Sequence, residues 1–180
     1  MKFILASASP RRSEILKNAG FDFEIIPSQQ EEVVDLSLNP QQVAESLALQ
    51  KAQSVFNQCK KPTLGADTIV TINGKILGKP KSYENSKELL RLLSGKTHQV
   101  ITGYAFITEN ETIVSSDVSF VTFNDLSNEL IESYTSLGLG MDKAGGYGIQ
   151  DGFDFVKCVE GSVNNVIGLP IEKIEKIING

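Results

Sequence analysis

Two adjacent arginines, Arg11 and Arg12, follow a short apolar segment and a run of small residues, in a stretch that reads KFILASASPRRSEIL from residue 2 to residue 16. A guanidinium group binds phosphate oxygens through paired N–H donors. Ser9 suits the N-cap and Pro10 the first turn of a helix, whose free N–H groups attract anions. The stretch therefore predicts a strand, a turn and a helix that bind phosphate. The alternative is the same structure with solvated or acid-paired arginines.

Asp67 stands in the middle of an otherwise apolar segment, TLGADTIVTI, at residues 63–72. Aspartate is rare in strands and costly to bury without a partner. The carboxylate therefore needs a metal, a cationic partner or a catalytic task. Gly65 and Ala66 leave room for a ligand to approach. We favour a functional role over the alternative, a bulge or strand end that the carboxylate caps.

Three further acids, Glu31, Glu32 and Asp35, fall in the polar segment 27–39, which has no clear period and is expected to be a loop. They are either a solvated acidic loop or a source of carboxylate for a divalent cation, which prefers hard oxygen ligands.

Two lysines occupy unusual positions. Lys51 falls on the apolar face of a helix expected over residues 40–57, where it either reaches water at the edge of the core or projects into a site. Lys79 stands between Gly78 and Pro80, on a stiff stretch of backbone, and is either a phosphate contact or an ordinary turn residue.

A glycine-rich stretch spans residues 138–152 and is expected to be a loop that passes close to a ligand. It lacks the strand–glycine–helix context of dinucleotide-binding motifs. Lys143, Tyr147 and Gln150 are its candidates to contact a base, sugar or phosphate.

The single histidine, His98, is expected to be a hydrogen-bonded structural residue of a strand over 97–108 rather than a base. Cys59 and Cys158 are far apart and form no metal-binding motif, so we expect neither a disulfide framework nor a zinc site. This cysteine usage is typical of the reducing cytosol, and a cytoplasmic location is expected.

The elements that must position these residues alternate between strands and helices. Strands are expected over 3–5, 21–26, 63–72, 75–77, 97–108, 112–123 and 153–159. Helices are expected over 10–19, over 40–57, after Ser82, through Leu126, Leu130, Tyr134 and Leu137, and after Pro170. At 180 residues the chain is expected to be one α/β domain, 1–180. The net charge of −5 argues against binding to nucleic acid or a membrane surface, and no apolar run is long enough to span a bilayer.

Cations and isolated carboxylates together are what a polyphosphate with a divalent metal requires. The cations are Arg11, Arg12, Lys51 and Lys79, and the acids are Glu32 and Asp67. No Ser-His-Asp set and no P-loop motif is present.

Six motifs, in this order along the chain, resemble those of the Maf family. They are ASASPRR, GADTIV, ILGKP, LSGKTHQVITG, DKAGGYGIQ and GSVNNVIGLP. Members of this family are nucleoside triphosphate pyrophosphatases, also described as septum-formation inhibitors. The resemblance implies a mixed α/β fold with an elongated, twisted sheet similar to inosine triphosphate pyrophosphatases. It also implies hydrolysis of a nucleoside triphosphate to the monophosphate and pyrophosphate, with Mg²⁺ or Mn²⁺.

The resemblance assigns roles to single residues. It implies that Asp67 is the general base and that Arg12, Glu32, Lys51 and Lys79 belong to the site. The family branch that acts on dTTP and UTP is marked by residues that correspond here to Arg11, Thr68 and Gln150. Two departures stand out. Ser82 replaces a usual acid, for which Glu84 is a candidate substitute, and Asp151 replaces a usual glycine and receives no role.

The mechanism expected from these residues assigns different roles to the cations and to the carboxylates. Arg12, Lys51 and Lys79, with Ser7 and the turn that follows it, hold the phosphates, while Glu32 and Asp67 hold the metal and Asp67 also orients water. A nucleoside triphosphate is the expected partner, and the resemblance implies a homodimer. The alternative function is a non-catalytic, nucleotide-binding regulator of cell division.

Overall fold

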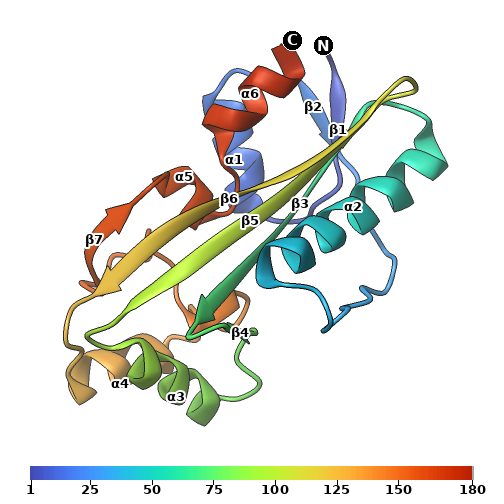
Figure 1. The fold of residues 1–180 in the computed structure, drawn as a ribbon. Helices are drawn as coiled ribbons and strands as arrows, with labels where there is room; N and C mark the ends of the chain where they lie inside the picture. The colour runs from blue at the N-terminus through green and yellow to red at the C-terminus, as the bar shows by residue number, and fades with distance from the viewer. Residues whose placement is uncertain (180) are drawn as a thin grey trace.

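The computed structural model describes residues 1–179, and within them seven strands form one mixed sheet in the order β2-β1-β3-β5-β6-β7, with β4 paired to β3 (Figure 1). The strands are β1 (Phe3–Leu5), β2 (Phe23–Ile25), β3 (Thr63–Ile72), β4 (Lys75–Leu77), β5 (Thr97–Ile107), β6 (Thr112–Phe123) and β7 (Val156–Glu160). β1 runs parallel to β2 and β3, and the other pairs are antiparallel. The mixed, elongated and twisted sheet expected from the resemblance is therefore present.

Helices lie on both faces of this sheet (Figure 1). They are α1 (Pro10–Asn18), α2 (Pro40–Cys59), α3 (Tyr83–Leu93), α4 (Asn128–Ser136), α5 (Val163–Ile167) and α6 (Ile171–Asn179). A short 3-10 turn covers Ala144–Gly146. Within residues 1–179, no helix combines the length and the apolar composition that crossing a bilayer requires.

The two-residue repeat of β3 sends alternate side chains to opposite faces. On one face Ile69 packs with Ala44 of α2. On the other face Ala66 packs with Leu16 of α1 and Ile174 of α6. Asp67 and Thr68 are neighbours in sequence, and they consequently point to different faces of the sheet.

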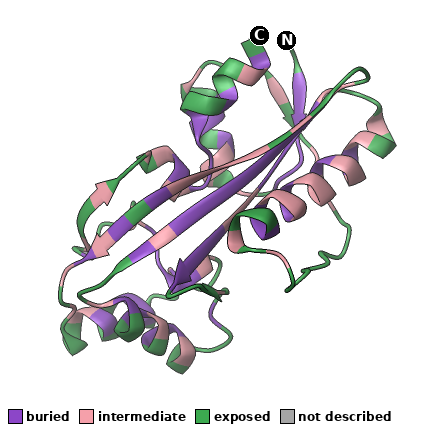
Figure 2. Ribbon diagram, in the orientation of Figure 1, coloured by how far each residue is buried: buried purple, intermediate pink, exposed green. Residues whose placement is uncertain are grey.

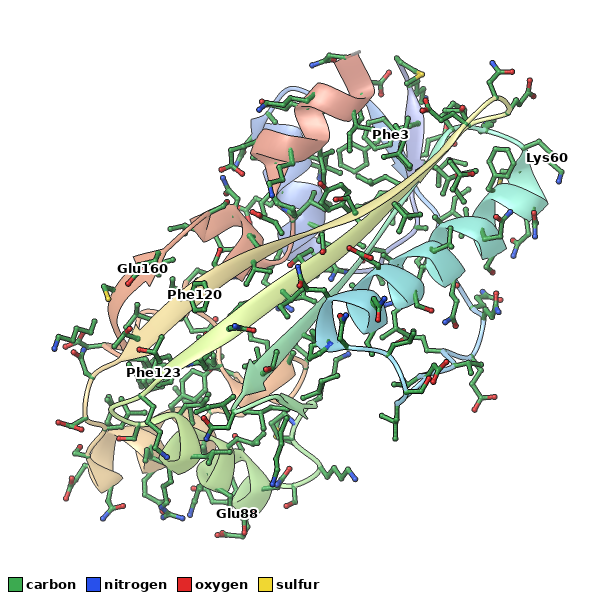
Figure 3. The ribbon with its side chains drawn as sticks, in the orientation of Figure 1. Phe3, Lys60, Glu88, Phe120, Phe123 and Glu160 are labelled. Atoms are coloured by element: carbon green, nitrogen blue, oxygen red, sulfur yellow. The ribbon has the colours of Figure 1, made fainter. Side chains whose placement is uncertain are left out.

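The core divides into clusters at the two ends of the long strands. Figure 3 labels Phe3 and Phe123, which lie at opposite ends of the molecule. Phe3 packs with residues of α1 and α6, and Phe123 packs with residues of α3 and α4. The middle of β5 is buried and joins the two ends (Figure 2).

Most expected elements are confirmed, and the errors have clear causes. β7 begins at Val156 rather than at residue 153, because Phe155 is buried against Tyr134 and Phe123 instead of extending the sheet. The expected apolar stripe on α4 is wrong at Leu137, which is 63% exposed, because Ile131 takes the inward position. The five-residue helix α5 has no apolar period and was not predicted.

Candidate active site

An exposed edge of β3 provides the wall of the main cavity. β1 pairs with β3 only at Thr63 and Leu64, and β4 pairs with it only from Val70 onward. Within residues 1–179, the edge between these two partners therefore has no neighbouring strand. A cavity of about 410 Å³ is lined by Asp67, Thr68 and Val70 of this strand, and its size suits a small-molecule ligand.

All the site residues predicted from the sequence line this one cavity. They are Ser7, Arg11, Arg12, Glu32, Lys51, Asp67, Thr68, Lys79 and Gln150. They come from the β1–α1 turn, the first turn of α1, the loop before α2, α2 itself, β3, the segment after β4 and the glycine-rich loop. The structure brings the residues together, while their chemical roles stay predictions.

On the α2 side of β3, Lys51 joins two carboxylates. Its ammonium donates to Asp67 Oδ1, and Glu32 Oε1 lies 3.0 Å from the same nitrogen. The Asp67 and Lys51 side chains are only 14% and 16% exposed, so water screens this pair weakly. Of the alternatives left open for Lys51, the structure favours projection into a site.

Arg12 lies on the opposite side of the same strand and is half-buried. Its guanidinium donates to Ser7 Oγ at 3.0 Å, to Thr68 Oγ1 at 3.1 Å and to the Gly168 carbonyl at 2.9 Å. Burial lowers the pKa of Arg12, and the Asp67 carboxylate opposes that shift. The group stays protonated, because arginine does not lose its proton in proteins. It is thus a fixed positive charge whose position is set by three partners.

Arg11 diverges from Arg12 although the two are adjacent. Its NH1 group lies 3.1 Å from Asp142 Oδ2, and Lys143 lies 3.1 Å from the other oxygen of the same carboxylate. Burial raises the pKa of Asp142, but hydrogen bonds from Lys143 and Arg11 outweigh it and bring the pKa below its ordinary value. Sequence reasoning missed Asp142, although it stands inside the DKAGGYGIQ motif.

The glycine-rich loop is fixed by buried polar groups. Tyr134 Oη donates to Asp151 Oδ2 at 2.6 Å and accepts from the Gly148 N–H at 3.0 Å. A Cβ on Gly148 would lie 2.5 Å from Asp151 Oδ2, so a larger residue there would push the Asp151 carboxylate out of its place. Asp151, to which the sequence assigned no role, therefore helps to hold the loop that carries Gln150.

His98 holds the same loop from the sheet. Its Nε2 lies 2.7 Å from Tyr147 Oη, and the side chain is buried, with its ring against Phe123. Burial lowers the pKa of His98 to about 4. His98 does not line the cavity, which agrees with the structural role expected for it.

The structure corrects two expectations, for Ser9 and for Glu84. Ser9 is the N-cap residue of α1, but its side chain makes no capping hydrogen bond. Ser7 Oγ instead accepts from the Ser9 N–H at 3.2 Å. Glu84 lies 3.5 Å from Lys87 on the surface and does not line the cavity. It therefore does not substitute for the acid that the family usually has at the position of Ser82.

The side chains that line the cavity differ between the two sides of β3. The Asp67 side carries the charges of Lys51 and Glu32. The Thr68 side continues along the strand to Val70, and Val70 is paired in register with Val100 of β5. Apolar groups on that side are Val70, Val100, Tyr147, Val166 and Ile167. Arg12 also lies on the Thr68 side, where it donates to Thr68 Oγ1. The cations next to Asp67 and Thr68 therefore suit a polyphosphate, and the apolar groups further along the Thr68 side suit a flat nucleobase.

The carboxylates fit a metal that arrives with its substrate. Residues 1–179 contain no group of three or more His, Cys, Asp or Glu side chains arranged to hold a metal ion. The Glu32 and Asp67 carboxylates both contact the Lys51 ammonium, so both can reach one common position. Mg²⁺ commonly uses one or two carboxylates together with substrate phosphates, so this donor set is suitable.

Comparison with known proteins supports the same interpretation. The Maf-like protein family matches residues 2–180. The dTTP/UTP pyrophosphatase of Bacillus cereus strain AH820 is 47% identical over 175 residues, which cover 96% of this chain and 92% of that protein. The protein of the same name from Bacillus anthracis strain CDC 684 / NRRL 3495 has the same identity and coverage. The Ham1 protein of Staphylococcus aureus has a TM-score of 0.50 at 19% identity, over 69% of this chain and 73% of that one, a likeness of fold alone.

Proposed function

The chain belongs to the Maf family, and on that premise we propose that it hydrolyses dTTP and UTP to the nucleoside monophosphate and pyrophosphate. The observation that carries the proposal is the position of Asp67, a carboxylate at an exposed strand edge that faces Lys51 and lies in one cavity with Arg12 and Lys79. A triphosphate needs such cations, and hydrolysis needs a carboxylate that can orient water.

We assign the phosphates to the cations of the cavity. Arg12 is anchored by Ser7 and Gly168, which leaves N–H groups of its guanidinium for phosphate oxygens. Lys51 and Lys79 supply two further positive charges from α2 and from the segment after β4. Arg12 is held in place before the substrate binds, so its charge can stabilise the charge that develops on pyrophosphate as it leaves.

Asp67 is the proposed base. It accepts a hydrogen bond from Lys51, and its other oxygen is available to orient the water that breaks the bond between the α and β phosphates. A divalent cation, Mg²⁺ or Mn²⁺, bound by Glu32 and Asp67 would supply charge neutralisation of the phosphates. Both roles use the negative charge of the Asp67 carboxylate.

Base selection is assigned to the other side of the cavity. Arg11, Thr68 and Gln150 are the proposed specificity residues, and the apolar groups around Val70 and Tyr147 would hold the ring. The homodimer and the cytoplasmic location expected from the sequence stay predictions.

Release of pyrophosphate from a nucleotide panel tests the proposal. The purified chain with Mg²⁺ is expected to release pyrophosphate and the monophosphate from dTTP and UTP. Release of orthophosphate would instead identify a phosphatase. Tight binding of nucleotide without any turnover would identify the regulator of cell division that the sequence left as the alternative.

A further inference from the structure

A chain of hydrogen bonds runs from the cavity into the core through two threonines. Arg12 NH2 donates to Thr68 Oγ1 at 3.1 Å, and Thr68 Oγ1 lies 2.9 Å from Thr102 Oγ1. Thr102 Oγ1 in turn donates to the backbone carbonyl of Asn165 at 2.9 Å. Thr68 lines the cavity, whereas Thr102 is fully buried behind it and does not.

The direction of this chain is fixed by its two ends. A guanidinium can only donate, and a carbonyl oxygen can only accept. The single proton of Thr102 is committed to the Asn165 carbonyl, so Thr102 must accept from Thr68. The single proton of Thr68 is then committed to Thr102. Thr68 therefore has no proton left for a ligand, and one of its two lone pairs already accepts from Arg12.

The accepting end of the chain is rigid. Asn165 is fully buried in α5, and its side-chain amide donates to the Val100 carbonyl at 3.0 Å and to Ser119 Oγ at 2.9 Å. These bonds tie α5 to β5 and β6 and hold the Asn165 carbonyl above Thr102. The remaining lone pair of Thr68 is thus the one free hydrogen-bonding position of a preorganised group at the cavity wall.

We propose that Thr102 is a positioning residue for base selection: it makes Thr68 an obligatory hydrogen-bond acceptor, which favours uracil and thymine over cytosine. The pyrimidine edge provides the chemical reason. Uracil and thymine carry a proton on N3, whereas N3 of cytosine is itself an acceptor and would face an acceptor at Thr68.

The inference rests on the proposed function, and the location of Thr68 supports it. Thr68 and Val70 lie on the same face of β3, and their partners in register on β5 are Thr102 and Val100. Val70, Val100 and Tyr147 give this side of the cavity the apolar surface that a nucleobase needs. The charged groups around Asp67 lie on the other side of the strand.

Three variants test the proposal. Thr102→Val keeps the shape of the side chain but removes the acceptor, so Thr68 regains a proton that it can donate to N3 of cytosine. Thr102→Ser keeps the hydroxyl and should restore the wild-type behaviour. Thr71→Val is the matched control, because Thr71 is a buried threonine of β3, the strand of Thr68, and points to the other face of the sheet.

The measurement is the ratio of kcat/KM for UTP to that for CTP, by pyrophosphate release. The wild-type chain, Thr102→Ser and Thr71→Val should prefer UTP. Thr102→Val should lower the ratio about tenfold, the factor that one ordinary hydrogen bond carries, in part by raising the value for CTP. A merely structural defect would lower both values together and leave the ratio unchanged. If Thr102→Val does not fold, Thr102→Ala replaces it with the same expectation.

Other outcomes separate the two proposals. If the wild-type chain releases pyrophosphate from UTP, an unchanged ratio in a folded Thr102→Val or Thr102→Ala variant overturns the inference and leaves the proposed function intact. Equal use of CTP and UTP by the wild-type chain overturns it as well. Failure of the wild-type chain to release pyrophosphate from any pyrimidine nucleotide overturns the proposed function itself.

Discussion

The ammonium of Lys51 lies between Asp67 and Glu32 and contacts both carboxylates. This is also the point at which the two carboxylates would hold a divalent cation. A single position cannot hold an ammonium and a metal at once, because like charges in close contact repel strongly. Metal binding at this position therefore requires Lys51 to move, and phosphate oxygens are natural acceptors for it.

We therefore expect Lys51→Met to bind Mn²⁺ more tightly than the wild-type chain when no nucleotide is present. Removal of a competing ammonium should tighten the metal by about tenfold or more, since charged hydrogen bonds are worth about 1.5–3 kcal/mol. Electron paramagnetic resonance of free Mn²⁺ measures this without turnover. Lys51→Arg, which keeps the charge, is the control. Equally weak Mn²⁺ binding by the wild type and Lys51→Met would contradict the shared position.

Asp67→Asn should reduce kcat with UTP by about 100-fold or more, because an amide cannot accept a proton from water. The substitution keeps the size of the side chain and an oxygen that can accept from Lys51, so the variant should fold, which thermal unfolding checks. Asp22→Asn, at an exposed position between α1 and β2 that does not line the cavity, serves as the control and should keep wild-type turnover. Turnover of Asp67→Asn near the wild-type rate would exclude Asp67 as the base.

Gly103→Ala should destabilise the protein because α2 leaves no room at this position. A Cβ on Gly103 would lie 2.2 Å from the carbonyl carbon of Ala44 and 2.3 Å from its oxygen. Overpacking of this kind costs about 1–3 kcal/mol in the free energy of unfolding, and it would also shift the helix that carries Lys51. Urea unfolding measures the loss.

Gly78→Ala is the matched control for this prediction, because a Cβ at Gly78 would meet no atom within 4 Å. Its free energy of unfolding should stay within about 1 kcal/mol of the wild type. Equal stability of Gly103→Ala and Gly78→Ala would show that α2 can move away from β5 at little cost.

The parts of the fold and site that the sequence predicted are those with a local signal. β3 was predicted at its exact bounds, because apolar β-branched residues are followed by the Asn73-Gly74 turn. Asp67 was singled out because a carboxylate in such a strand conflicts with its surroundings. Lys51 was singled out because a charged side chain on an apolar helix face also conflicts with its surroundings. The Lys51 and Asp67 side chains meet in the cavity.

The parts that could not be predicted depend on contacts between distant segments. Thr102 looks like an ordinary strand residue, and only the register of β5 against β3 places it beside Thr68. α5 is too short for a helical period, yet it supplies the carbonyl that orients Thr102. Asp142 stands in a glycine-rich loop, and only the folded loop brings it to Arg11.

The buried pair of His98 and Tyr147 predicts a specific dependence of stability on pH. Burial lowers the pKa of His98 from 6.5 to about 4, and Nδ1 of the ring has no hydrogen-bond partner within residues 1–179. Tyr147 is the titratable side chain against the ring, and burial raises its pKa, so Tyr147 stays neutral. Between about pH 4 and pH 6.5, the unfolded chain binds a proton on His98 that the folded chain does not bind.

The free energy of unfolding should therefore fall as the pH drops from 7 to 5, by about 1–2 kcal/mol from this group. The paired surface carboxylates, with pKa values below their ordinary range, contribute mainly at lower pH. Urea unfolding of the wild type and of His98→Gln at pH 7 and pH 5 measures the difference. His98→Gln removes the titration but keeps a group that can bond Tyr147, so its stability should be nearly flat over this range. An equal loss in both proteins would assign the pH dependence to groups other than His98.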